Sequence, residues 1–118
     1  MLDKSKLFAF RIIKLYKHLT DGAKYQTCES ILSAQVLRSG TSIGANIHEA
    51  RRAQSTADFI AKLYISLKEA DETGYWLELL HNAGAITDRE FESINTDCEE
   101  LLKLLTTIIK STQKRNNS

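Results

Sequence analysis

The sequence predicts an all-α protein, an antiparallel up-down four-helix bundle. Proline, which breaks helix interiors, is absent from all 118 residues. Apolar residues recur at spacings of three and four, as they do on one face of a helix. Short polar segments separate four such stretches, and short connections join antiparallel neighbours. The length suits one domain with a single core, which we expect at residues 1–114.

The first two helices are expected at about residues 3–20 and 27–53. Gly22 suits the end of the first helix, because glycine readily adopts the left-handed conformation of a C-terminal cap. Thr27 marks the start of the second. Apolar residues of the first helix recur four, three and four residues apart and therefore share one face: Phe8, Ile12, Leu15 and Leu19.

The last two helices are expected at about residues 56–83 and 88–113, followed by a frayed polar tail at 115–118. Thr87 and Glu90 have the spacing of a capping box, in which each side chain satisfies a free backbone N–H of the first turn. A seven-residue repeat runs through the third helix: Phe59, Leu63, Ser66, Ala70, Thr73, Leu77 and Leu80. The expected stripe of the fourth helix is Phe91, Ile94, Cys98, Leu101, Leu105, Ile108 and Thr112.

Charge is unevenly distributed along the chain although the net charge is only +1. Residues 1–54 carry nine basic and four acidic residues, and residues 55–102 carry three and eleven. Residues 103–118 carry four basic and no acidic residues. Two interpretations stay open, either solvated helix faces or a basic face placed beside an acidic one. The small net charge gives no bulk drive toward nucleic acid.

The cysteines and the apolar segments indicate a cytoplasmic protein. Cys28 and Cys98 lack CxxC spacing and lie in helical segments, which predicts buried reduced thiols rather than a disulfide. The first ten residues lack the apolar run of a signal peptide. No segment approaches 18 apolar residues, so we expect no membrane partner.

The stretch RSGTSIGANIHEARR, residues 38–52, contains two glycines in a segment that otherwise has helical character. A Walker phosphate loop needs four residues between its glycines and then lysine, whereas Gly40 and Gly44 enclose three and no lysine follows. On a helix, residues four apart share a face, and glycine there lets another helix approach closely. Close helix packing and a helix kink are the two alternatives.

Polar residues follow the same stretch three, four and three positions apart and form a line on one helix face: Ser39, Ser42, Asn46 and Glu49. If the line is partly buried, each group needs a hydrogen-bond partner. A fully exposed line is the alternative.

Trp76 lies beside the core positions Leu77 and Leu80 but is offset from the main stripe. It either completes the core of the monomer or packs on another subunit, because tryptophan is enriched among interface anchors.

No catalytic or metal-binding motif emerges from the sequence. Glu78 and His81 form a single Glu-x-x-His pair, whereas the di-metal carboxylate bundles need two such pairs and two further glutamates. No serine or cysteine has the local signature of a nucleophile with its base. The sequence therefore predicts no enzymatic activity and no cofactor.

Five basic residues are candidates for phosphate contacts: Arg38, Arg51, Arg52, Arg11 and Lys14. Arg51 and Arg52 near a helix C-terminus also complement the helix macrodipole without a ligand, and this explanation is sufficient by itself.

Two segments, residues 37–50 and 58–80, resemble the four-helix bundle protein family, also called the 23S rRNA intervening sequence protein family. The resemblance covers nearly the whole chain and is weakest in the first helix and the tail. Many members have proline where this chain has Gly44, and glycine where it has Ala50. The matching positions are Arg38, Ser39, Ser42, Ile43, Asn46, Ile47, Glu49, Asp58, Phe59, Leu63, Lys68, Glu69, Glu72, Thr73, Tyr75, Trp76 and Leu77.

The resemblance implies a bacterial four-helix bundle that assembles into a ring, typically a pentamer. Some members are encoded in insertions within ribosomal RNA genes. A related member, the accessory variability determinant of diversity-generating retroelements, resembles a basic pentameric barrel that partners a reverse transcriptase and nucleic acid. The expected function is therefore a homo-oligomeric adaptor for nucleic acid or nucleoprotein, with a protein-binding scaffold as the alternative. Basic and acidic regions of neighbouring subunits are expected to steer the ring contact.

Overall fold

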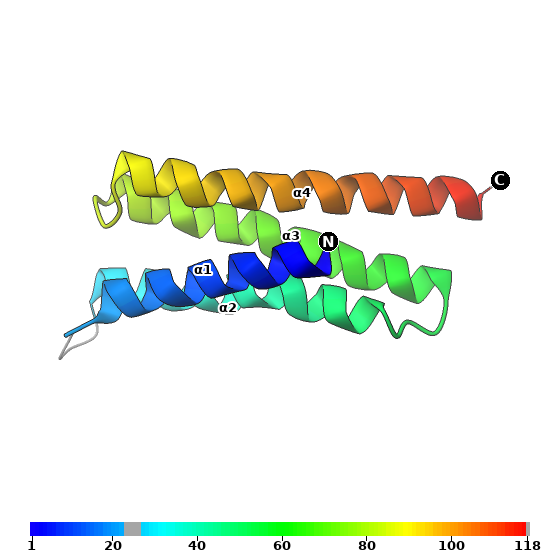
Figure 1. Ribbon diagram of the computed structural model, residues 1–118, viewed down its shortest axis with the longest axis horizontal. Coiled ribbons are helices and arrows are strands. Elements are labelled where there is room, and N and C mark those ends of the chain that lie inside the picture. Colours follow the sequence, from blue (N-terminus) through cyan, green and yellow to red (C-terminus); the bar gives the residue numbers. More distant parts are fainter. Residues whose placement is uncertain (23–26, 118) are drawn as a thin grey trace.

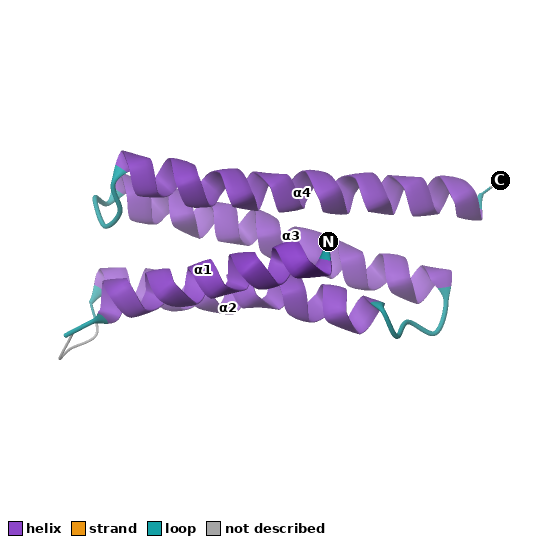
Figure 2. Cartoon of the chain, viewed as in Figure 1, coloured by secondary structure: helices purple, strands orange, loops and turns teal. Residues whose placement is uncertain are grey.

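The computed structural model describes residues 1–22 and 27–117, which form an elongated bundle of 54 × 24 × 20 Å (Figure 1). The described residues contain four helices and no strand (Figure 2), so the expected all-helical fold class is confirmed. Each helix packs on the next in the chain and α1 packs on α4, while α1 and α3 are a diagonal pair whose Cα atoms stay more than 8 Å apart. The helices are α1 (Leu2–Thr20), α2 (Cys28–Ala50), α3 (Thr56–Asn82) and α4 (Asp88–Asn116).

Side-chain caps fix the starts of three helices. Thr27 and Ser30 form a capping box at α2, and the Oγ of Ser55 accepts the backbone N–H of Asp58 at α3. At α4, the expected capping box of Thr87 and Glu90 is present. Its hydrogen bonds, above all that from the Thr87 backbone, hold the pKa of Glu90 below its usual range.

Two helix ends differ from those expected. α2 ends at Ala50, three residues early, because Arg52 and Ala53 donate to carbonyls three residues back, as in a turn. α4 continues to Asn116, so the first two of the four tail residues expected to fray are helical; Ser118 lies outside the described residues.

The helices are unequal in length, with 19 residues in α1 and 29 in α4. The N-terminus consequently lies part-way along the bundle, whereas the C-terminus and the α2–α3 connection lie at the same end (Figure 1). Only α2, α3 and α4 reach that end.

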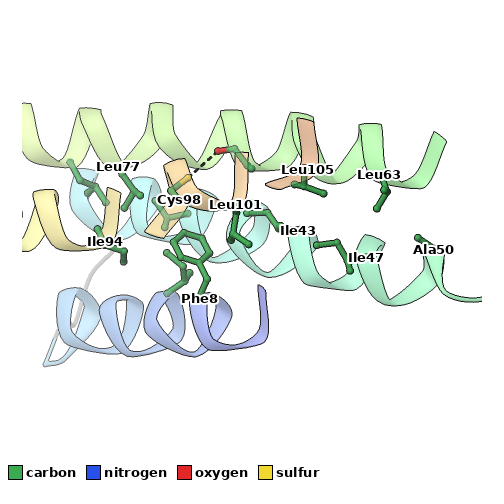
Figure 3. Close-up of a cluster of buried hydrophobic side chains, with 14 of the residues drawn as sticks. Phe8, Ile43, Ile47, Ala50, Leu63, Leu77, Ile94, Cys98, Leu101 and Leu105 are labelled. Carbon is green, nitrogen blue, oxygen red and sulfur yellow. Dashed lines mark hydrogen bonds between the residues drawn. The ribbon is translucent and has the colours of Figure 1, made fainter. Parts of the chain in front are cut away.

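The core gathers side chains from all four helices, with Phe8 entering from α1 and Cys98 and Leu101 from α4 (Figure 3). Six of the seven repeat positions in α3 are buried, and Phe59 is half-buried. In α4, Ile109 is buried in place of the expected Ile108. From Leu105 to Thr112, a stripe through Ile109 takes steps of four and three residues, and a stripe through Ile108 takes steps of three and four. Both fit the helical period equally well.

The two cysteines differ in environment. Cys98 is buried, whereas Cys28 is exposed in the first turn of α2, so the expectation that both thiols are buried is wrong for Cys28. Both are free thiols.

Candidate nucleic-acid interface

Gly40 and Gly44 lie inside the continuous helix α2 and face α1. A Cβ atom at Gly40 would lie 2.9 Å from Cγ1 of Ile12, and one at Gly44 would lie 3.2 Å from Oγ of Ser5. These distances are shorter than ordinary carbon contacts. The glycines therefore allow α2 to approach α1 closely, and α2 is not interrupted at either of them.

Ser39 begins the polar line and is fully buried between α2 and α3. Its hydroxyl donates to the carbonyl of Gln35 at 2.9 Å and accepts from the hydroxyl of Thr73 at 2.8 Å. A buried hydroxyl without such partners would be destabilising. Ser39 thus belongs to the seam between the two helices and not to an accessible surface.

The rest of the polar line grows more exposed toward the end of α2. Ser42 is half-buried and donates to the Arg38 carbonyl at 2.7 Å. The side-chain amide of Asn46, also half-buried, donates to the Ser42 carbonyl at 2.8 Å. Glu49 is exposed and pairs with Lys62 of α3 at 3.1 Å. These partners account for the line without a ligand.

Trp76 is half-buried and packs against the core. Its ring lies edge-on to Tyr75, with centroids 5.2 Å apart. The buried Nε1 of Trp76 has no hydrogen-bond partner among the described residues, so the indole contributes through packing.

Arg38 crosses from α2 to two carboxylates of α3. Its guanidinium pairs with Glu69 at 3.4 Å and with Glu72, and its Nε donates to Gln35 at 3.2 Å. The charge of Arg38 is therefore offset inside the chain, although its side chain is 49% exposed.

Replacing Arg38 with glutamate is expected to lower the free energy of unfolding by about 1 kcal/mol at low salt. The new carboxylate would face Glu69 and Glu72, whose charges it would repel. Urea denaturation checks this, and the loss should shrink in roughly 1 M salt, where the Debye length is about 3 Å. Arg38→Gln removes the attraction without adding repulsion and should have a smaller effect. A salt-independent loss would contradict the ion-pair explanation.

Arg51 and Arg52 lie at the end of the bundle that only α2, α3 and α4 reach. Both are exposed, and Nη2 of Arg51 lies 3.2 Å from Nδ1 of His48. The last turns of α4 reach the same end (Figure 1) and bring further exposed basic residues. We call this surface the basic end: Arg51, Arg52, Lys110, Lys114 and Arg115.

A pocket of 390 Å³ lies between the start of α3 and the end of α4, lined by Thr56 of α3 and by Thr112, Arg115 and Asn116 of α4. Residues 50–57 and 101–117 contain no aspartate or glutamate. Two acidic residues flank the α2–α3 segment. Glu49 pairs with Lys62 at 3.1 Å, and the carboxylate of Asp58 accepts the backbone N–H of Gln54 at 3.2 Å. Among the described residues, Arg51, Arg52, Lys110 and Lys114 have no ion-pair partner.

Arg11 and Lys14 lie elsewhere, in a cleft of 460 Å³ between α1 and the start of α4. Arg11 is engaged there, since it donates to Asp97 at 2.5 Å and to the Ser93 hydroxyl at 2.9 Å. Lys14 and Arg89 also line this cleft. The structure therefore distributes the five sequence candidates over three places and does not bring them together.

Lys110, Lys114 and Arg115 were missed as candidates by sequence reasoning. The excess of basic residues in 103–118 was the available signal. Its meaning depends on the fold, in which α4 ends at the same end of the bundle as the α2–α3 connection (Figure 1).

The described residues contain no group of three or more His, Cys, Asp or Glu side chains suited to a metal ion. His81 instead stacks on Phe91, with ring centroids 4.4 Å apart, and its Nε2 lies 2.6 Å from Oδ1 of Asp88. Within the described part of the chain, no helix has the length and hydropathy needed to cross a membrane.

Fold and surface together define an all-helical bundle with one strongly basic end. The family described as 23S rRNA-intervening sequence protein matches residues 1–107, and the chain belongs to this family. The resemblance found in the sequence is thereby confirmed. The basic residues of the last turns of α4 lie beyond the matched segment.

A solved structure is also similar to the chain. It is the crystal structure of a protein with unknown function from the S23 ribosomal protein family of Bacteroides thetaiotaomicron VPI-5482. The two are 58% identical, and the alignment covers 92% of this chain and 97% of that one with a TM-score of 0.86. The chain has no significant match among curated proteins.

Proposed function

We propose that this protein is a non-enzymatic, cytoplasmic adaptor that assembles with copies of itself and holds a nucleic acid at the basic end of each bundle. The observation that carries the proposal is the convergence of Arg51 and Arg52 with three basic residues of α4 on one end. A ring of five copies is the assembly that the family resemblance implies.

The local charge of the basic end supports nucleic-acid binding better than the net charge of +1 does. Exposed cations attract phosphates and release the counterions condensed on the nucleic acid, whatever its sequence. Because Arg38 is paired within the chain, we assign it a smaller part than Arg51 and Arg52. The family description names 23S rRNA, which makes RNA the first nucleic acid to test.

Reversing the charge of Arg51 and Arg52 to glutamate is expected to weaken binding of a single-stranded RNA oligonucleotide at least about tenfold. The slope of log K against log salt should also fall by about 1.4, since each lost phosphate contact contributes about 0.7 for single strands. Fluorescence anisotropy at several salt concentrations measures both effects. The ratio of absorbance at 260 and 280 nm reports whether RNA is retained during purification.

A second variant and a matched control test whether the basic end itself is responsible. Lys110→Glu with Lys114→Glu should weaken binding similarly, whereas Arg89→Glu with Lys103→Glu changes the charge equally outside the basic end and should not. Circular dichroism checks folding, because a glutamate at position 51 opposes the helix dipole. Loss of binding in the control alone would move the site to the cleft between α1 and α4. No binding by the native chain would refute the nucleic-acid role.

A protein-binding scaffold without a nucleic-acid role is the second candidate. Large apolar side chains are exposed on α2 and α3, with Ile31 47% and Ile65 43% accessible. Exposed apolar surface of this kind is typical of interaction sites when it forms a contiguous patch. The RNA measurements above separate the two candidates.

A further inference from the structure

The outer face of α1 combines lysines with two large apolar side chains that project away from the core. Leu7 is 67% exposed and Phe10 is 62% exposed. Lys6, Lys14 and Lys17 are also exposed. Spacings of three, four and seven residues place all five on one side of the helix. We call this surface the α1 face.

A cleft of 470 Å³ between α3 and α4 has the opposite charge. Asp71 and Glu78 of α3 and Glu99 of α4 line it, and no lysine or arginine does. Apolar surface is present too, since Tyr75, which is 56% exposed, and Leu102 lie in the same lining. We call this surface the acidic cleft.

The charges of these two surfaces differ from those at the seams between helices. Among the described residues, none of the three lysines of the α1 face and none of the three carboxylates of the acidic cleft has an ion-pair partner. Charges at the seams, in contrast, are paired across neighbouring helices: Lys4 with Glu100, Arg11 with Asp97, Arg38 with Glu69 and Glu72, and Lys62 with Glu49.

We propose that the α1 face of one copy docks into the acidic cleft of a second copy of this chain. The inference rests on the self-association proposed above and identifies the two surfaces that carry it. Charge complementarity selects the partner, because the unpaired cations of one surface match the unpaired carboxylates of the other.

The two surfaces cannot meet within one bundle. α1 and α3 are a diagonal pair whose Cα atoms stay more than 8 Å apart, and the α1 face points outward from the core. A contact between two different surfaces of identical chains is heterologous. Repeated contacts of this type close into a ring when the rotation permits and otherwise extend as a filament.

The apolar side chains supply affinity, while the charges supply orientation. Phe10 and Leu7 would lose water against Tyr75 and Leu102, and buried aromatic anchors dominate many interfaces. The surrounding lysines and carboxylates steer association and disfavour contact of either surface with its own copy, in which like charges would meet. Because salt screens such steering, assembly should slow at high ionic strength.

Charge reversal on each surface tests the docking. Lys6→Glu with Lys14→Glu makes the α1 face acidic, and Asp71→Lys with Glu78→Lys makes the cleft basic. Each variant alone should lose self-association, with the dissociation constant raised at least about 100-fold. An equimolar mixture should assemble again, because each reversed surface then meets its complement. Light scattering measures the masses. Because each favourable contact joins one variant to the other, the two variants should alternate in the mixed assemblies. A closed mixed ring therefore has an even number of copies, and a mixed ring of five would keep one contact between like variants.

Arg51→Glu with Arg52→Glu is the matched control, since it changes the charge as much as the α1-face variant but lies at the basic end, and it should keep the native mass. Variants that retain the native mass, or a mixture that stays dissociated, would overturn the docking while leaving self-association intact. A native chain that is monomeric at micromolar concentration would overturn the proposed self-association as well.

Discussion

Substituting leucine for Gly40 is expected to lower the free energy of unfolding by at least about 3 kcal/mol. A Cβ at this position would already lie 2.9 Å from Cγ1 and 3.1 Å from Cγ2 of Ile12. Ile12 has no exposed surface, and protein interiors are close-packed with few voids. The substitution must therefore separate α1 from α2. Urea denaturation followed by circular dichroism measures the loss.

An alanine scan of two glycines isolates this effect from helix propensity. Alanine favours a helix interior by about 0.5–1 kcal/mol over glycine. At Gly74 the nearest atom to an added Cβ is Sγ of Cys98 at 4.0 Å, so Gly74→Ala should stabilise the protein by about that amount. Gly40→Ala should destabilise it, because overpacking against Ile12 exceeds the gain. Stabilisation by both substitutions would contradict the close approach of α1 to α2.

The close approach at Gly40 shows what the spacing of residues in the sequence can predict and what it cannot. Two glycines four apart in an otherwise helical segment predict a thin helix face, and the structure identifies α1 as the helix that packs on it. The glycine spacing does not predict which helix packs against this face, because the same spacing would allow close contact with any of the other helices. That assignment depends on the order of the helices in space.

The register of α4 illustrates a second limit. Ile108 and Ile109 are adjacent and equally apolar, and either continues a helical stripe from Leu105. Packing against α3 selects Ile109. The unexpected exposure of Cys28 has a related cause, because the first turn of a helix projects beyond the layer that the middle of the bundle buries.

The candidate interface was predicted less completely than the fold. Sequence reasoning selected Arg51 and Arg52 near the end of the expected second helix but also selected Arg38, whose charge Glu69 and Glu72 of α3 offset. Whether two side chains on different helices form an ion pair depends on how each helix is rotated about its axis. The sequence pattern of one helix does not contain this information. The basic end likewise depends on the arrangement of the helices in space, which puts the last turns of α4 and the α2–α3 connection at the same end of the bundle.

Cys98 is expected to make the stability of the fold fall at alkaline pH. Burial, reinforced by the nearby carboxylates of Glu99 and Asp71, raises the pKa of the Cys98 thiol from 9.0 to about 12. The thiol is 1% exposed and donates to the Ala70 carbonyl, with Sγ 3.3 Å from the oxygen (Figure 3). The unfolded chain therefore releases this proton at lower pH than the folded chain does.

The sign of the effect follows from this difference. The stabilising contribution is complete below about pH 9 and is lost progressively as the pH rises toward 12. By about pH 10.5 the loss should reach about 2 kcal/mol, at 1.36 kcal/mol for each pH unit. Denaturation midpoints between pH 8 and 10.5, on the order of six conditions, suffice to resolve such a slope.

Cys98→Ala isolates the contribution of this thiol from that of tyrosines and lysines, which titrate in the same range. The variant starts less stable because it leaves a cavity, but its stability should fall less steeply above pH 9 than that of the native chain. Cys28→Ala is the matched control, since Cys28 is exposed and its removal should leave the native slope unchanged. Parallel curves for the native chain and Cys98→Ala would show that the buried thiol ionises as readily in the folded chain as in the unfolded one. The packing of α4 against the Ala70 turn of α3 would then have to admit water to Sγ, in conflict with a thiol that is 1% exposed.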